Sequence, residues 1–377
     1  MKPFAAALVC LAAASAWADS TRIRRTLVGG ATIFVESFKD AEKVSLQVIA
    51  SARGTEDSAE THGARHLLEH LAALGRTGQV DALLEGEGLY LTAATNLETM
   101  RFEVSCRRSQ VPLAIRALDD ILSGLRVSED DIKREARLIK EELALVSDRR
   151  NRFREITEMA LGSPAWDPLG TPELIARVTP DALKKLHQTH FCQANLTVVV
   201  SGAVSLTEGE TWADQIAKLA PASPALPLEW RARPIAQTAR MLNDNAWTFA
   251  MPYRELTAPD SIARIAQAFG LATLAGGEVS FSPARDHGLA MIDVPNDDTY
   301  RWALAQNADA ITWYGLRAMR RWFNAEAADP TRSGTLRGRL IAAQPFLTPE
   351  KVLEAIADLK APTKARAWEE WQRLCRS

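Results

Sequence analysis

The residues best suited to chemistry in this sequence lie in the stretch ARHLLEHLAA, residues 64–73. If the stretch is helical, His66 and His70 share one face, one turn apart, and Glu69 lies beside His66. Two imidazoles at this spacing can bind one zinc ion, and a neighbouring carboxylate can take up a proton. The order His-x-x-Glu-His is the inverted zinc motif. The alternative for these residues alone is a surface helix with two solvated histidines.

A zinc site that activates water also needs a third protein ligand, and the candidate lies in a second helical segment. Residues 128–155, SEDDIKREARLIKEELALVSDRRNRFRE, have the periodicity of one long helix that continues to about residue 161. On a helical wheel Glu135 and Glu142 fall inside the apolar arc, whereas Glu141 points the opposite way. A buried carboxylate is costly unless it is paired or binds a metal. We therefore expect one of the two glutamates to reach the metal and the other to support the site.

The elements that must position these residues alternate between strands and helices. In the first half, strands are predicted at 31–38, 43–50, 88–95, 100–106 and 195–202, and helices at 64–74, 111–125 and 179–191. In the second half, strands are predicted at 246–253 and 288–294, and helices at 260–276 and 299–327. Strands in runs of two with helices between them favour an α+β layer architecture.

A chain of 377 residues is too long for one ordinary core, so two domains are expected. Residues 219–234 contain four prolines and show no periodicity, which predicts a linker. The predicted organisation is a zinc-binding domain at 19–218 and a second domain at 235–377.

The first 18 residues, MKPFAAALVCLAAASAWA, are typical of a secretory signal peptide. No later run approaches the ~20 apolar residues of a membrane-spanning helix, so we expect a soluble protein that is periplasmic or secreted. A formal net charge of −2 without a basic block argues against a nucleic-acid partner. The remaining cysteines, Cys106, Cys192 and Cys375, allow either one disulfide bridge or three free thiols.

The motif and its spacing resemble the pitrilysin-type (M16, inverzincin) zinc metallopeptidases, a family that includes insulin-degrading enzyme and the mitochondrial processing peptidase. ARHLLEHL is followed by Glu142 within REARLIKEE, and LTAATNLETMRFEV resembles the family's Asn-Ala-x-Thr cleft strand. TPDALKKLHQTHFCQANLTVVVSG resembles the end of the family's first domain, and SFSPARDHGLAMIDV its second-domain Leu-Arg-Glu…Gly-Leu-Ala-Tyr segment. The resemblance is strong to residue 203 and weak beyond it.

The resemblance implies a role for each residue of the motif. His66, His70 and Glu142 would be the zinc ligands, Glu69 the general base that activates zinc-bound water, and Glu135 a carboxylate that assists the site. It also implies two M16-like α/β sandwich domains that face each other as a clam shell. The expected activity is zinc-dependent hydrolysis of peptides or unfolded segments.

The sequence departs from the family pattern at the substrate-binding positions. The cleft-strand asparagine aligns with Thr92, before Ala93, and the second-domain arginine aligns with Arg285. Met291 stands where the family has a tyrosine that helps to stabilise the oxyanion. A homodimer, or a heterodimer with a second M16-like chain, would supply the missing contacts. The alternative is a non-catalytic scaffolding or peptide-binding subunit.

Histidines and tryptophans outside the motif are given structural interpretations. His62, His187 and His190 are expected to be solvated surface or capping groups. Trp302 and Trp313 belong to an aromatic-rich segment that is either a partner surface or the buried face of a helix, and the buried face is favoured.

Overall fold

The computed structural model describes residues 21–51, 62–96, 98–145, 148–161, 168–222, 239–243, 246–253, 256, 258–282, 288–295, 298–343 and 347–376. The chain divides into two compact units. One unit consists of Met1–Ala144, Pro168–Glu229 and Asn324–Ala342, and the other of Leu145–Asp167, Trp230–Phe323 and Ala343–Ser377. The predicted signal peptide and most of the predicted linker lie outside the described residues.

The first unit is built on a six-stranded mixed sheet with the order β1-β2-β6-β3-β5-β4. The strands are β1 (Thr21–Thr26), β2 (Thr32–Ser37), β3 (Val44–Ser51), β4 (Leu91–Thr95), β5 (Thr99–Cys106) and β6 (Leu196–Gly202). Neighbouring strands are antiparallel except for the parallel pair β2–β6. β4 is an edge strand, so its outer side carries no partner within the described part of the chain.

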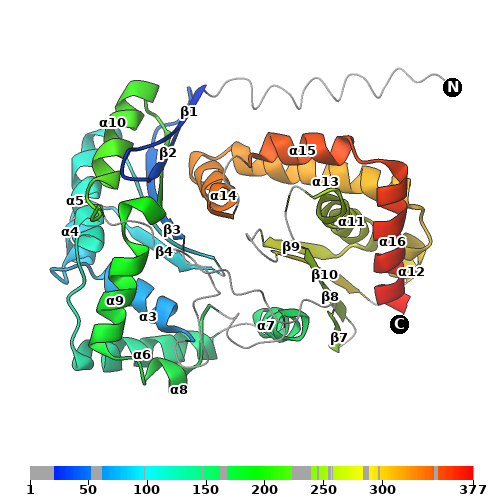
Figure 1. Ribbon diagram of the computed structural model, residues 1–377, viewed down its shortest axis with the longest axis horizontal. Coiled ribbons are helices and arrows are strands. Elements are labelled where there is room, and N and C mark those ends of the chain that lie inside the picture. The colour runs from blue at the N-terminus through cyan, green and yellow to red at the C-terminus, as the bar shows by residue number, and fades with distance from the viewer. Residues whose placement is uncertain are drawn as a thin grey trace. The chain divides into compact units, whose positions relative to one another are not determined.

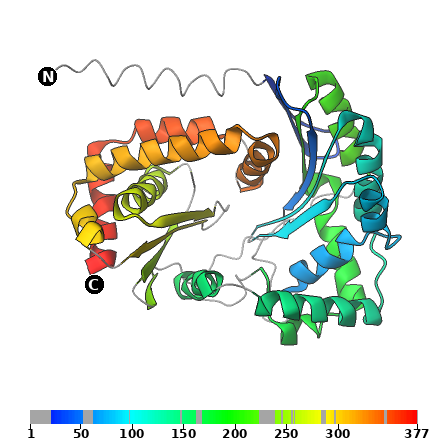
Figure 2. The same ribbon diagram turned by 180° about the vertical axis from the view of Figure 1, so that it is seen from behind.

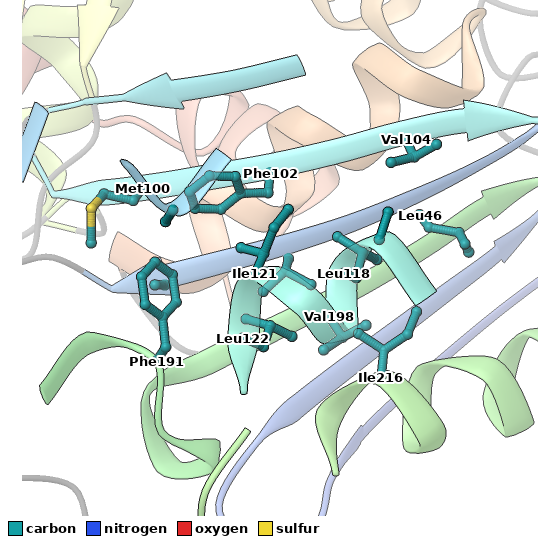
Figure 3. Close-up of a cluster of buried hydrophobic side chains, with 14 of the residues drawn as sticks. Leu46, Met100, Phe102, Val104, Leu118, Ile121, Leu122, Phe191, Val198 and Ile216 are labelled. Carbon is teal, nitrogen blue, oxygen red and sulfur yellow. The ribbon is translucent and has the colours of Figure 1, made fainter. Parts of the chain in front are cut away.

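One face of this sheet carries the main core of the unit. Helices α5 (Val111–Leu122) and α10 (Leu206–Ala217) cover it (Figure 1), and α3 (Ala64–Ala73) packs beside them on β4 and β5. Alternate strand residues such as Leu46, Phe102 and Val198 meet Leu118 and Ile216 from the helices, and all five are buried (Figure 3). The period-two pattern thus sends one set of side chains into this core.

The opposite face of the same sheet is covered by α14 (Pro330–Ala343), which comes from the last part of the sequence (Figure 2). Its contacts are largely polar. Ser333 and Arg337 both donate hydrogen bonds to the buried carboxylate of Glu36, at 2.7 and 3.2 Å. Gly338 approaches so closely that a Cβ there would lie 1.9 Å from Ile49 Cδ1. The helix is therefore held to the sheet by a buried ion pair and by close packing.

The second unit has a four-stranded antiparallel sheet with the order β7-β8-β10-β9. Its strands are β7 (Ala239–Asn243), β8 (Ala246–Tyr253), β9 (Glu278–Ser282) and β10 (Gly288–Pro295). Helix α11 (Pro259–Ala275) covers one face, and α7 (Asp148–Leu161) covers the other (Figure 1). The described part of this sheet is two strands smaller than the first, in line with the short second half of the sequence.

The remaining helices complete the two units. They are α4 (Val80–Glu85), α6 (Glu129–Ala144), α8 (Pro172–Ile175), α9 (Pro180–His190), α12 (Asp298–Leu304), α13 (Ala308–Ala327), α15 (Pro349–Ala357) and α16 (Ala361–Arg376), with short 3-10 turns at Arg108–Gln110 and Gln193–Asn195. The α+β architecture expected from the sequence is confirmed. No helix among the described residues is long and apolar enough to cross a membrane.

The prediction of one long helix from Glu129 to about Leu161 is wrong. α6 ends at Ala144 and α7 begins at Asp148. The two helices bury their side chains in different units, because α6 packs on α3 whereas α7 packs on β7 and β8. The apolar periodicity continues across the break, so the wheel did not reveal the change of packing partner.

The predictions for two residue types, histidine and tryptophan, also need correction. His62, His187 and His190 are buried, with exposed fractions of 2, 3 and 1%. His187 Nε2 lies 3.0 Å from the carbonyl oxygen of Ile121, a contact made across helices that local sequence does not show. Trp302 and Trp313, expected to be buried, are half exposed.

None of the cysteines Cys106, Cys192 and Cys375 forms a disulfide bridge within the described residues, which decides between the two alternatives left by the sequence. Cys106 and Cys192 are buried. Burial raises the pKa of the Cys106 thiol to about 11, so it is unreactive at neutral pH.

Candidate metal centre

Helix α3 presents its leucines and its motif residues on different sides. Leu67, Leu68 and Leu71 are fully or almost fully buried in the core, so the other side of the helix carries His66 and His70. That side is covered by α6. The leucines therefore fix the rotation of the helix that carries the motif.

The start of α3 is shaped by two glycines. Gly63, with φ 86°, precedes the helix, and Gly170, with φ 70°, lies against it. A Cβ on Gly170 would lie 2.3 Å from Gly63 Cα, so only glycine allows the two backbones to approach this closely. The contact brings the carbonyl of Leu169 to 3.3 Å from His66 Nδ1.

Helix α6 supplies the carboxylates. It begins with a capping box, in which the Asp131 amide donates to Ser128 Oγ at 3.2 Å and the Ser128 amide donates to Asp131 Oδ2 at 2.9 Å. Glu135 is buried, as the helical wheel predicts. The burial expected for Glu142 is not found, since its side chain is 43% exposed. Glu142 lies near the end of the helix, where less of the surrounding structure covers it.

The structure brings His66, His70 and Glu142 together. Glu142 Oε2 lies 3.4 Å from Nε2 of each histidine, and the three candidate ligand atoms lie within 4.8 Å of one another. Ligands bound tetrahedrally to zinc at about 2.0–2.2 Å are separated from each other by roughly 3.3–3.5 Å. The donor set and the two glutamate–histidine distances therefore fit a zinc ion.

Each histidine is held at its other ring nitrogen. His66 Nδ1 faces the Leu169 carbonyl, and His70 Nδ1 lies 3.5 Å from Glu135 Oε2. Acceptors at Nδ1 favour the tautomer in which Nε2 carries the free lone pair. Both Nε2 atoms are thus prepared to bind a metal on the side where Glu142 lies.

The electrostatics of the site favour a cation. Burial opposes the charged form of His70, but Glu135, Glu69 and Glu142 together outweigh it and raise the pKa of His70. The hydrogen bond with His70 is the main cause that lowers the pKa of Glu135, against the effect of burial, and Arg134 contributes at 3.0 Å. Three carboxylates around one imidazole concentrate negative charge, which a divalent ion would neutralise.

Glu69 lies at the same site but is not one of the three converging ligands. Its exposed fraction is 8%. Burial raises the pKa of Glu69, Thr95 and His70 offset this in part, and Glu142 adds to it. A carboxylate with a raised pKa next to a metal site suits a general base, because it can release the proton that it has taken up.

The edge strand β4 contains the predicted substrate-binding residues Thr92 and Ala93. Ala93 faces the core side of the sheet, and Thr92 is exposed on the other side. Thr95 shares a strand face with Ala93, and its buried Oγ1 makes no hydrogen bond of normal geometry within the described residues. This hydroxyl lies at Glu69, where it contributes to lowering that pKa.

The second-domain residues are placed only in part. Arg285 lies outside the described residues. Met291 lies in β10 of the second unit with an exposed fraction of 6%, and its sulfur is 3.8 Å from the Thr157 hydroxyl of α7.

Sequence reasoning missed two contributors to the site, Leu169 and Thr95. Leu169 acts through its backbone carbonyl, which no side-chain pattern reveals. The period-two alternation of β4 could have indicated Thr95, because that residue shares a face with Ala93.

The first comparison with known proteins finds a family that part of the chain resembles. Residues 33–174 match the family described as insulinase, peptidase family M16. This matched segment, less than half of the chain, is similar to peptidase family M16. An uncharacterized zinc protease of Streptomyces coelicolor is 26% identical to this chain over 192 residues, which cover 48% of the chain and 41% of that protein. A probable mitochondrial-processing peptidase subunit beta of Arabidopsis thaliana is 28% identical over 213 residues, 54% of the chain and 39% of that protein.

The matches to these curated relatives thus span about two fifths of their length. The fold resembles that of a solved structure over nearly the whole chain. The periplasmic protease PqqL of Escherichia coli superimposes with a TM-score of 0.70 and 19% identity, covering 93% of this chain and 46% of that one. At this level of identity the likeness shows the fold.

Proposed function

We propose that this chain is an M16-like, zinc-dependent endopeptidase that hydrolyses peptides or unfolded protein segments. The observation that carries the proposal is the convergence of His66, His70 and Glu142, with both histidines held at Nδ1 so that Nε2 is left for the metal. The second support is the raised pKa of Glu69 beside these ligands. A motif on a surface helix would need neither feature.

His66, His70 and Glu142 would hold the metal. Zinc bound there would supply Lewis-acid chemistry, polarising the scissile carbonyl and making water more acidic. Glu69 takes the proton of the attacking water and then delivers it to the leaving amine nitrogen. Glu135 fixes the orientation of the His70 ring through its contact with Nδ1 of that ring.

We propose that the peptide binds along β4. An edge strand offers unpaired backbone groups to an extended peptide. Thr92 and Ala93 lie in the middle of this strand, and its last residue, Thr95, meets Glu69. Binding along β4 would therefore bring a peptide bond to the catalytic glutamate.

Location and assembly are part of the proposal. Export stays a prediction from the first 18 residues, and the resemblance to a periplasmic protease supports it. A dimer with a copy of this chain or with another M16-like chain would supply the arginine and tyrosine contacts, because Met291 cannot donate a hydrogen bond. A match to a protein named as a subunit supports this assembly.

The decisive test is cleavage of a quenched peptide mixture by the purified chain and by Glu69→Gln, with zinc content measured for both. We expect the wild type to cleave, and the variant to bind zinc but lose activity by at least about a hundredfold, in the range of general-base catalysis. Equal activity in both would show that a contaminant cleaves the peptides. Zinc binding without activity in either would exclude an enzyme that works alone.

The second candidate is a non-catalytic subunit that binds peptides or a partner enzyme, and Met291 favours it. Titration with an intact M16-like partner separates the candidates. If Glu69→Gln abolishes the activity of the mixed assembly, this chain supplies the catalytic metal. If the variant changes nothing, the chain is a scaffold.

A further inference from the structure

Arg65 is placed where an arginine is unfavourable for local stability. It lies in the first turn of α3, and its exposed fraction is 1%. A cation near a helix N-terminus opposes the helix dipole, and burial of a guanidinium carries a desolvation cost. Gly63 provides no side-chain cap that would offset these costs. A favourable interaction of Arg65 must therefore offset these two costs.

The contact made by Arg65 lies at the end of the edge strand. Its Nη1 donates a hydrogen bond of 2.8 Å to the backbone carbonyl of Asn96, the residue that follows β4. The amide of Asn96 donates in turn to the carbonyl of Thr99, the first residue of β5, at 2.7 Å. The turn between β4 and β5 is thus fastened to the beginning of α3.

Arg65 and Glu69 are separated by four residues and lie on one face of α3. Two consecutive residues at the end of β4 meet this face. Asn96 accepts from Arg65, and Thr95 lies near enough to Glu69 to lower the pKa of that carboxyl. The helix that carries the motif is therefore bonded to the residue after β4, and the last residue of β4 lies beside Glu69.

We propose that Arg65 is a positioning residue, which sets Glu69 against Thr95 and so aligns the base with a peptide bound on β4. This inference rests on the proposed peptidase function. The metal ligands do not need Arg65, because their second contacts come from Leu169 and Glu135. Loss of the guanidinium would release the end of β4 and leave the metal-binding residues in place.

The test compares Arg65→Met, which keeps the apolar part of the side chain, with Arg65→Lys, which keeps the charge and a single donor nitrogen. For Arg65→Met we expect kcat to fall by about ten- to a hundredfold, the effect of a misplacement of about 1 Å. KM should change by less than about threefold, and zinc content should stay equal to that of the wild type. Arg65→Lys should recover part of kcat.

The matched control is Arg76→Met, which removes an arginine just beyond the other end of α3. Arg76 is half exposed and lies 3.7 Å from Asp120, away from the motif residues. We expect wild-type kcat and KM. A reduced kcat in this control would show that any loss of charge near α3 is harmful, and would overturn the specific role of Arg65.

A double-mutant cycle that combines Arg65→Met with Thr95→Val distinguishes a positioning role of Arg65 from a general loss of stability. If Arg65 acts through the Thr95–Glu69 contact, the double variant should lose less kcat than the product of the two single losses. Independent losses would overturn the inference. If Arg65→Met does not fold, the same double-mutant cycle with Arg65→Lys shows whether the two losses of kcat are coupled.

The outcomes distinguish this inference from the proposed function. Wild-type cleavage with unchanged kcat in Arg65→Met overturns the inference and leaves the peptidase proposal intact. A zinc-loaded wild type that cleaves nothing, either alone or with an intact M16-like partner, overturns both.

Discussion

At the scale of single residues, the three α6 glutamates Glu135, Glu141 and Glu142 differ in what their carboxylates contact. Glu135 is buried against His70, Glu142 faces both histidines, and Glu141 is exposed. The helical wheel separated Glu141 from the other two, because direction around a helix follows from residue number. It did not separate Glu142 from Glu135 in burial, because burial depends on what packs beyond the helix.

These three positions predict a graded loss of zinc affinity. Glu135→Gln should weaken zinc binding by about ten- to a hundredfold, as expected when a histidine loses its supporting carboxylate. Glu142→Gln should weaken it further because it removes a ligand, and Glu141→Gln should have no effect. Competition with a chromophoric chelator measures all three. Wild-type affinity in Glu142→Gln would contradict the assignment of the third ligand.

His187 makes stability depend on pH. Burial lowers the pKa of His187, and the Ile121 carbonyl offsets this in part. The unfolded chain therefore binds a proton, at its ordinary pKa of about 6.5, that the folded chain does not. Stability is lost as the pH falls below that value.

For His187→Gln we expect a smaller loss of stability between pH 7.5 and 5.5 than for the wild type, since glutamine has no titratable ring. Urea midpoints at the two pH values give the comparison. An equal shift in both proteins would show that other groups carry the acid sensitivity.

At the scale of elements, the sequence predicted well what depends on short-range pattern. The cap of α9 is an example, since Thr179 accepts from the Ala182 amide, as expected for a threonine before Pro180. The limits of β8 also agree with the predicted 246–253. The division between α6 and α7 escaped prediction because it depends on the unit in which each helix is buried.

The contact between Gly63 and Gly170 is an element-level feature that should affect the metal. Gly170→Ala introduces a Cβ that would lie 2.3 Å from Gly63 Cα, so the loop must move and carry Leu169 away from His66. We expect zinc affinity to fall by about tenfold.

Gly78→Ala is the matched control for this substitution, because Gly78 has a similar positive φ of 71° and a Cβ added there would meet no atom within 4 Å. It carries the same backbone strain without the collision. Equal zinc affinities in the two variants would assign any loss to strain and not to the Leu169 contact.

At the scale of the whole molecule, composition and length predicted two domains, but not how the chain is shared between them. α7 clusters with the second unit although α6 and α8, its neighbours in sequence, pack together in the first, and α14 clusters with the first although it follows α13. Local periodicity carries no information about which unit a helix will pack in.

Zinc should stabilise the folded chain as a whole. Its proposed ligands come from α3 and α6, so a bound ion links two helices that are distant in sequence. At a free zinc concentration a thousandfold above Kd, the gain is about 4 kcal/mol. Removal of zinc by a chelator should lower the thermal midpoint of the wild type and of Glu69→Gln. The same treatment should change Glu142→Gln much less, and an equal change in all three would contradict the site.

α7 and α14 each pack in a different unit from their neighbours in sequence. For α14, this determines how late in synthesis the first unit can finish folding. During synthesis, every strand of the first sheet is available once residue 202 has been made, yet α14 follows more than a hundred residues later. Until then Phe34, Ile49 and Val199 lack the helix that buries them. An incomplete chain therefore exposes an apolar and polar sheet face that can aggregate. Fragments that end near residue 222 should be poorly soluble, and chaperone binding should concentrate on this interval of chain growth.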